Sequence, residues 1–230
     1  MRLGFARFLK ILFSSFFIQT SWSFFSLQEM GFLFTLISGA KKEQKDRIIK
    51  THKGFFNTHP YMSSYIAGAT VRAYDDEKSS DEEIKKFTTI AQTSFASAGD
   101  LLFWNTLRPA LLVLSVILAL KSGIIGPIVF LVAYNVFHLY HRINGIREGY
   151  NRGKEVIYLL KSKRFTTVQK IFEILGAFCS GLLISVISLK VNYLLVIPLA
   201  ALFMLLLLKR FSSILIIVVA VLLLLIMLIL

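Results

Sequence analysis

The sequence predicts an all-α integral membrane protein with multiple transmembrane helices, several of them broken or re-entrant at Pro and Gly, and an amphipathic helix near the N-terminus. Of its 230 residues, 56% are apolar and 17% are charged, and the mean hydropathy is +0.69. Long uncharged runs lie at the C-terminal end, and apolar stretches interrupted by Pro and Gly lie upstream. A water-soluble domain needs more polar surface than this composition supplies.

The net charge is the second constraint on the class of protein. The chain carries 26 Lys and Arg against 13 Asp and Glu, a balance of +13. These cations must lie outside the hydrocarbon, and they suit an anionic cytoplasmic leaflet. Nucleic acid also attracts such a surplus, but the apolar runs require lipid, so we expect no nucleic-acid partner. The single cysteine, Cys179, lies in an apolar run and excludes an intramolecular disulfide.

Residues 1–53 are expected to form an N-terminal amphipathic and polar helical region. Within the apolar stretch 11–34, polar side chains recur at spacings of four, four and three, at Ser15, Gln19, Ser23 and Ser26. This spacing predicts a polar stripe on an otherwise apolar helix. Such a helix lies flat on a membrane or packs on a partner subunit.

Residues 54–140 are expected to form a core of broken helices. Pro60 interrupts the apolar segment 54–71, Arg108 and Pro109 interrupt 101–120, and Pro127 with two glycines interrupts 122–140. Breaks in lipid leave backbone groups unsatisfied unless protein or a watery cavity covers them. Repeated breaks are typical of transport sites built from discontinuous helices, although Pro kinks are also common in membrane helices generally.

The remainder of the chain divides into a basic loop, residues 141–170, and C-terminal transmembrane helices, residues 171–230. Segment 171–189 contains only one charge, Glu173, and segments 191–208 and 211–230 contain none. At about 1.5 Å per residue, each approaches the length needed to cross a bilayer. The excess of Lys and Arg in the preceding loop predicts that this loop faces the cytoplasm.

The sequence lacks the residue patterns that are typical of metal sites and of enzyme active sites. His52 and His59 are seven residues apart and His138 and His141 three apart, but no carboxylate or cysteine accompanies either pair at ligand spacing. We therefore expect no metal site, and the second pair is interpreted as interfacial. The sequence has no G-x-S-x-G, Walker or G-x-G-x-x-G motif. No catalytic residue and no cofactor are expected on this chain.

Six polar residues lie within or beside apolar runs: Asn57, His59, Asp100, Asn105, Arg108 and Asn135. Intramembrane ionisable groups cost about 2.5 to 3.5 kcal/mol on insertion scales, so they normally face a bundle interior, a pathway or a partner. Asp100 and Arg108 are eight residues apart and can project to similar sides of a helix.

Purely structural interpretations of these residues stay open. Asp100 can act as the N-cap of a helix that begins at Leu101, with Arg108 reaching toward lipid headgroups. Trp104 offers an aromatic face on which a sugar ring can stack, but a single Trp is as often an interfacial anchor.

Several ordered motifs resemble one known family. Residues 55–61 read F-F-N-T-H-P-Y, preceded by His52 and followed by Gly68, which resembles the hallmark of the IID subunit of the mannose-class sugar phosphotransferase system. Residues 99–109, G-D-L-L-F-W-N-T-L-R-P, are similar to that family's G-D-x-x-F-W-G-T-x-R-P segment. A third block matches in order and rough spacing, namely Gly126-Pro127, Tyr134-Asn135, Gly145, Gly149-Tyr150 and Gly153. The resemblance covers about residues 15–190.

Two motifs of that family are altered in this chain. Where the family usually reads N-Y-E-R-M-Q, residues 23–28 read S-F-F-S-L-Q. Where it usually reads M-G-P-L-A-G, residues 94–98 read S-F-A-S-A. These departures concern substrate recognition more than the fold. They leave open a diverged subunit with a structural or receptor role and no transport of its own.

The resemblance implies a multi-pass protein of the bacterial inner membrane that forms a hetero-oligomer with a IIC subunit. IIA and IIB phosphocarriers would relay phosphate through their own histidines and phosphorylate the sugar as it enters. A hexose is neutral and rich in hydroxyls, so we expect it to bind amide, carboxylate and aromatic side chains of the motifs, with Asn57 and Asp100 foremost: Asn57, His59, Asp100, Trp104 and Asn105. We expect structural or gating roles, with glycines and prolines as hinges, at Pro60, Gly99, Arg108, Pro109, Pro127 and Asn135.

Overall fold

The computed structural model describes residues 3–191 and the isolated positions 202, 215, 218, 219 and 222. The described residues contain no β-strand, only isolated bridges between Ser23 and Leu27 and between Leu27 and Phe56. The expected all-helical fold is therefore confirmed. The elements in chain order are α1 (Phe5–Ser15), α2 (Glu29–Gly39), the 3-10 turn η1 (Lys42–Gln44), α3 (Lys45–His52), α4 (Ser63–Asp76), α5 (Asp81–Gly99), the π-helix η2 (Asp100–Leu107), α6 (Arg108–Ser122), α7 (Ile125–Arg152), the 3-10 segment η3 (Gly153–Lys161) and α8 (Lys163–Val191).

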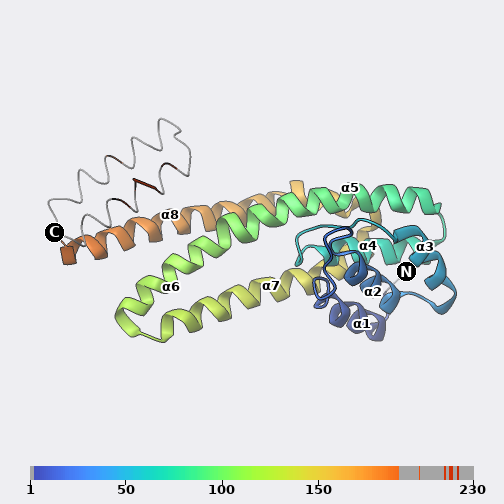
Figure 1. The fold of residues 1–230 in the computed structure, drawn as a ribbon, viewed down its shortest axis with the longest axis horizontal. Coiled ribbons are helices and arrows are strands. Elements are labelled where there is room, and N and C mark those ends of the chain that lie inside the picture. Colours follow the sequence, from blue (N-terminus) through green and yellow to red (C-terminus); the bar gives the residue numbers. More distant parts are fainter. Residues whose placement is uncertain (1–2, 192–201, 203–214, 216–217, 220–221, 223–230) are drawn as a thin grey trace.

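Helices α1 to α4 gather at one end of the molecule, and three long helical arms extend from that end (Figure 1). The first arm is α5, which continues through η2 into α6. The chain then reverses, and α7 returns to the helical cluster, where it packs along α4. Helix α8 runs back beside α6, which therefore contacts both α7 and α8. The core of the cluster thus lies where α4 and α7 meet.

Close packing of α4 on α7 depends on glycines. A Cβ atom at Gly149 would lie 2.2 Å from the carbonyl oxygen of Tyr65, and one at Gly68 would lie 2.4 Å from that of Ile146. A side chain at either position would therefore overlap the backbone of the facing helix. The two glycines let the helix backbones approach closely, as small residues do in many membrane helix pairs.

One described helix is long and apolar enough to cross a membrane by length and composition, the continuous helix Asp81–Ser122 formed by α5, η2 and α6. The break expected at Arg108 and Pro109 is therefore wrong. Pro109 lacks a backbone N–H and its ring clashes with the carbonyl four residues earlier. The preceding residues adopt a π-helix instead of interrupting the helix. Such π segments are rare and occur often at functional sites.

The break expected in segment 122–140 is a turn between two helices. Gly123 has a φ of +54° and follows α6, and α7 begins two residues later at Ile125. Pro127 lies in the first turn of α7, where a missing N–H removes no intrahelical bond. Segment 122–140 is therefore a hairpin corner followed by regular helix. By contrast, the break expected at Pro60 is confirmed, since α4 begins only at Ser63.

The single amphipathic helix expected over residues 11–34 is wrong. Helix α1 ends at Ser15, and α2 begins at Glu29 after a reversal of the chain. Within the reversal, the hydroxyl of Ser23 accepts the backbone N–H of Ser26 at 3.1 Å. Polar side chains of this kind compete with the helix for backbone hydrogen bonds, so the supposed polar stripe contains a turn signal.

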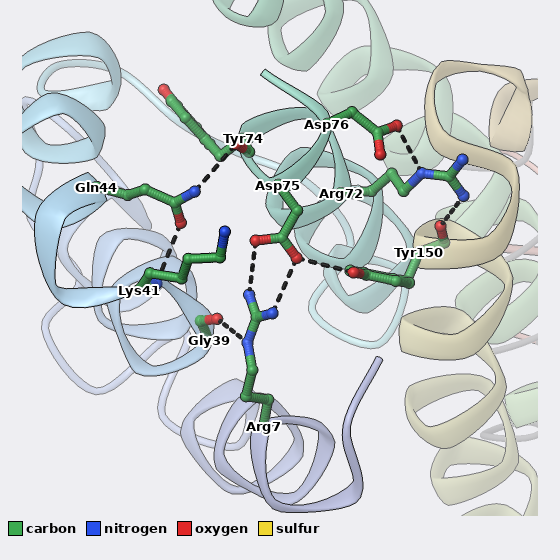
Figure 2. Close-up of polar contacts among 9 residues, drawn as sticks. All are labelled: Arg7, Gly39, Lys41, Gln44, Arg72, Tyr74, Asp75, Asp76 and Tyr150. Atoms are coloured by element: carbon green, nitrogen blue, oxygen red, sulfur yellow. Dashed lines mark hydrogen bonds and ion pairs between the residues drawn. The ribbon is translucent and has the colours of Figure 1, made fainter. Parts of the chain in front are cut away.

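A buried carboxylate joins α1 to the cluster (Figure 2). The side chain of Asp75 is only 1% exposed and receives two hydrogen bonds from Arg7, at 2.9 and 3.1 Å. The Tyr150 hydroxyl donates a third at 2.8 Å, and Arg7 also donates to the carbonyl of Gly39. This set of contacts connects α1, the end of α2, α4 and α7.

The basic segment 141–170 is helical and is not an open loop. It comprises the end of α7, all of η3 and the start of α8. Its cytoplasmic placement and the division of the chain at residues 53, 140 and 170 stay predictions. Segment 171–189 lies within α8, whereas the expected spans 191–208 and 211–230 fall almost entirely outside the described residues.

Candidate functional site

The candidate site is built on the non-helical segment that precedes α4. Two buried glutamines from distant elements fix its backbone. Gln28 accepts the N–H of Thr58 at 3.1 Å and donates to the Thr58 carbonyl at 2.9 Å. Gln92, on α5, accepts the N–H of Asn57 at 3.1 Å. These bonds satisfy backbone groups that a helix or strand would otherwise pair, and they leave the Asn57 side chain exposed.

His59 is the buried centre of the site. Its ring is stacked on Phe103, with centroids 4.9 Å apart, and is tilted against Trp104 at 5.0 Å. Tyr61 packs edge-on against it at 5.0 Å. His59 is 1% exposed, and neither ring nitrogen has a hydrogen-bond partner among the described residues. The His59 ring therefore packs as an aromatic side chain, and both of its nitrogens are buried.

Gly99 allows the long helix to reach His59. A Cβ atom at position 99 would lie 2.4 Å from the Cβ of His59 and 2.9 Å from the Cγ of Met62. Real Cβ atoms do not approach other atoms so closely. The absence of a side chain at Gly99 lets α5 lie directly on the segment that carries His59 and Pro60.

The π-helix η2 sets the direction of the next side chains. Thr106 donates its hydroxyl proton toward the carbonyls of Leu101 at 2.9 Å and Leu102 at 2.7 Å. Phe103 is fully buried in this segment, whereas Trp104 is 46% exposed and Asn105 is also exposed. The π turn therefore presents an aromatic face and an amide on the outside of the molecule, beside the buried His59.

Asp100 occupies the start of η2 and does not act as an N-cap. Its backbone is helical, with φ −60° and ψ −44°, and the helix continues through it from α5. The N-cap interpretation of Asp100 is therefore wrong. No ion pair joins Asp100 and Arg108 within the part of the chain that the structure describes. The wider π turn between them invalidates the spacing argument, which assumed regular α-helical turns.

The structure brings together some of the predicted site residues and separates others. His59, Pro60, Gly99 and Trp104 belong to one packed group. Arg108 and Pro109 lie further along the same long helix and are exposed. Pro127 and Asn135 lie on α7, and the Asn135 amide donates to the carbonyl of Leu131 in its own helix at 2.8 Å.

A second group of residues beside the site was missed by the sequence reasoning. Arg142 is 4% exposed, donates from Nε to His138 at 2.7 Å and also donates to the carbonyl of Ser15. Its guanidinium lies 5.4 Å from the ring centroid of Tyr61, and Tyr61 in turn packs on His138 at 4.0 Å. This group ties the end of α1 and the segment before α4 to α7.

The interfacial interpretation of the second histidine pair is also wrong for one member. His141 is 7% exposed, and its Nδ1 lies 3.0 Å from the hydroxyl of Tyr65. The i, i+3 spacing was the available signal, because it places His138 and His141 on one face of α7. What they face, α4 and the segment before it, is a long-range contact that no local pattern contains.

Fold and site together define an all-helical membrane protein in which a long apolar helix carries exposed aromatic and amide side chains beside a cap of short helices. Residues 3–230 match the model of the PTS system mannose/fructose/sorbose family IID component. The chain belongs to this family.

Named relatives agree with this membership. The chain is 29% identical over 181 residues to the mannose-specific EIID component of Escherichia coli K12, covering 73% of this chain and 62% of that protein. It is 30% identical over 179 residues to the fructose permease IID component of Bacillus subtilis, with 74% and 65% covered. It is 34% identical over 181 residues to the sorbose-specific EIID component of Lacticaseibacillus casei, with 74% and 63% covered. The matched region thus spans less than two thirds of each relative.

Solved structures share the fold. One described as a structure of a membrane protein aligns with a TM-score of 0.73 at 23% identity, covering 95% of this chain and 94% of that one. A cryoEM structure of the mannose transporter ManYZ with microcin E492 aligns with a TM-score of 0.61 at 23% identity, covering 94% and 93%. At such identities the likeness establishes the fold alone.

Proposed function

We propose that this chain is the membrane subunit of a phosphoenolpyruvate-dependent sugar phosphotransferase permease. With a IIC subunit it forms the pathway by which a mannose-type hexose enters, and IIA and IIB partners phosphorylate the sugar. The complex lies in the bacterial inner membrane, which this chain crosses several times. Family membership and the mannose, fructose and sorbose named in the relatives' descriptions support this assignment.

The observation that carries the proposal is the exposed polar and aromatic face at η2. A hexose is neutral and rich in hydroxyls, so its site needs hydrogen-bonding partners and an aromatic surface away from bulk water. Trp104 offers the surface, and Asn57, Asn105 and Asp100 offer the partners. Because such groups are costly against lipid, a neighbouring subunit covers this face. The site is then shared between two chains.

The phosphoryl chemistry belongs to the partner chains. His52, His59 and His141 are 4%, 1% and 7% exposed. A histidine that accepts a phosphoryl group must be reached by the donor in line with its ring nitrogen, and apolar neighbours around a buried ring prevent this approach. The burial of these histidines therefore supports a role in binding and gating rather than in phosphoryl transfer.

Substitution of Asp100 tests the site directly. Asp100→Asn removes one charged hydrogen-bond acceptor with little change of shape, so sugar uptake should fall about tenfold while assembly with the IIC subunit is preserved. Uptake of labelled sugar and co-purification of the subunit measure the two effects. Asp76→Asn is the control, because it makes the same change at a carboxylate that pairs with Arg72 in its own helix, and it should leave uptake unchanged. Collapse of assembly in Asp100→Asn would make Asp100 structural and end the site assignment.

A second candidate function is a structural or receptor role without transport. The altered segments 23–28 and 94–98 favour it. One member of the first segment is nevertheless retained: Gln28 occupies the position of the family's final Q, and its side chain holds the backbone of Thr58. If deletion of this chain removes the IIC subunit from the membrane, while substitutions of Asn57, Asp100 and Trp104 leave sugar uptake unchanged, the second function is established.

A further inference from the structure

A cavity of about 610 Å³ lies among α4, α5, α7, η3, α8 and the buried side of η2 at Leu102, and none of the five predicted sugar-binding residues lines it. Its volume falls within the range of pockets that hold small molecules, roughly 300 to 1,000 Å³. The cavity is therefore distinct from the face at η2, and the proposed transport function does not use it.

One part of the cavity wall is apolar. Phe95 from α5, Phe137 from α7, and Phe165 and Val168 from α8 contribute to it. Phe95 is fully buried, and Phe137 and Phe165 are partly buried. A wall of this kind offers hydrocarbon contacts and few partners for hydroxyl groups, which makes it suitable for an acyl chain and unsuitable for a sugar.

Polar residues of α7 line another part of the wall, at positions separated by four residues: Tyr140, Asn144, Glu148 and Arg152. This spacing places them on one face of the helix. Glu148 and Arg152 form an ion pair at 2.5 Å, so their charges offset each other. The polar wall of α7 therefore contributes no net charge to the cavity.

Arg164 supplies the excess positive charge. It lines the cavity and donates to the hydroxyl of Tyr140 at 3.0 Å. Within the part of the chain that the structure describes, no carboxylate lies within ion-pairing distance of it. Lys161 and Lys163 are exposed on either side of Ser162, which also lines the cavity. The polar part of the cavity is thus positive and lacks a counter-ion.

We propose that this cavity binds an anionic phospholipid, with an acyl chain against the phenylalanines and the phosphate at Arg164. An occupant must combine a hydrocarbon chain with a negative charge, because the wall combines an apolar part with an unpaired cation. Basic pockets between membrane helices recognise anionic headgroups in this way, and an arginine fork suits phosphate geometry. The bound lipid fills the space between α7 and α8 and fixes the position of α8 against the helical cluster.

The test uses the full chain, purified in detergent, freed of lipid and examined by native mass spectrometry. It is titrated with phosphatidylglycerol, with phosphatidylcholine of the same acyl chains, and with inorganic phosphate. The variants are Arg164→Gln, Val168→Trp, which fills the apolar part of the cavity, and Lys170→Gln. Lys170 is an exposed cation on the same helix that does not line the cavity, so it provides the matched control.

The wild type should bind one phosphatidylglycerol at least about tenfold more tightly than phosphatidylcholine, and Arg164→Gln should abolish this preference. Val168→Trp should weaken both lipids, Lys170→Gln should change neither, and phosphate alone should not bind. Equal binding of the two lipids, equal effects of Arg164→Gln and Lys170→Gln, or binding of phosphate alone would overturn the proposal. Because Val168→Trp tests the apolar part independently, unfolding of Arg164→Gln would still leave a decisive measurement, and unchanged lipid binding by Val168→Trp would reject the site.

Discussion

Gly99 is the residue on which the packing of the candidate site depends most directly. It forms the point where α5 touches the segment of His59, and the space beside it is already filled. The glycine could be identified in the sequence as part of a motif, but the sequence did not show why a side chain is excluded at this position. The reason is a contact across 40 residues of chain, from position 59 to position 99.

Replacement of Gly99 by Ala should destabilise the protein by about 1 to 3 kcal/mol, because the added methyl group overlaps His59 and Met62. A lower midpoint of thermal unfolding in detergent would show it. Gly4→Ala is the control, since Gly4 is exposed, its φ of −63° suits any residue, and a Cβ atom there meets no atom of the described residues within 4 Å. Equal unfolding midpoints for the two variants would contradict the packing described at His59.

His52 gives a prediction at the same scale for the dependence on pH. It lies at the end of α3 between Phe32 and Tyr74, and burial lowers its pKa from 6.5 to about 4, with Lys85 lowering it further and Asp81 opposing. Between those pH values the unfolded chain binds a proton that the folded chain does not. The contribution of His52 to the free energy of unfolding is therefore fully present above about pH 6.5 and is lost as the pH falls toward 4.

At pH 5 the loss attributable to His52 should be about 2 kcal/mol relative to pH 7.5. Unfolding midpoints at the two pH values measure it. His52→Phe keeps an aromatic ring between Phe32 and Tyr74 but cannot be protonated, so its midpoint should fall less on acidification. An identical pH dependence in the variant would show that other groups govern acid sensitivity.

At the scale of elements, one buried carboxylate attaches α1 to α4 and α7, while Arg142 separately holds the carbonyl of Ser15 at the end of α1. Asp75 accepts hydrogen bonds from Arg7 and Tyr150, and these are the polar contacts that join α1 to α4 and α7 in Figure 2. Removing one partner of a buried ion pair leaves the other uncompensated, which costs more than an exposed pair contributes.

Asp75→Asn should therefore destabilise the protein by about 2 to 4 kcal/mol and loosen α1, whose end Arg142 still contacts. Hydrogen exchange measured by mass spectrometry should rise in residues 5–15 ahead of the rest of the chain. Asp76→Asn is the adjacent control, because Asp76 pairs with Arg72 at a partly exposed site within one helix. This substitution should cost about 0.3 to 0.5 kcal/mol. Unchanged exchange in α1 of the Asp75 variant would show that apolar packing and the contact of Arg142 with Ser15 suffice to hold this helix.

Which elements could be predicted depended on whether their signals were local. Pro60 was correctly interpreted as a break, because α3 ends at His52 and α4 begins only at Ser63. Pro109 was misinterpreted, because a π-helix absorbs the proline inside a continuous helix of 42 residues. The serines of residues 15–26 were assigned to a helical stripe, although the same side chains also form turns, and the choice is made by the packing of α1 against α2.

At the scale of the whole molecule, the sequence identified the motif residues of the site but not the residues that support them. His59 and Trp104 were chosen from their motifs and do meet. Gln28, Gln92 and Arg142 were missed as supports, because each acts on a segment at least 30 residues away. Such side chains are ordinary polar residues in the sequence, and only the three-dimensional fold shows that they are buried.

The molecule as a whole presents an aromatic, amide-bearing face on its long apolar helix, and we infer that a hexose route runs along this face where a IIC subunit covers it. The most direct measurement is uptake and phosphorylation of a panel of labelled sugars in cells that supply the cognate partners, with and without this chain. The account predicts that at least one hexose accumulates as its phosphate only when the chain is present. Accumulation that is equal without the chain, or absent for every sugar with it, would contradict the account.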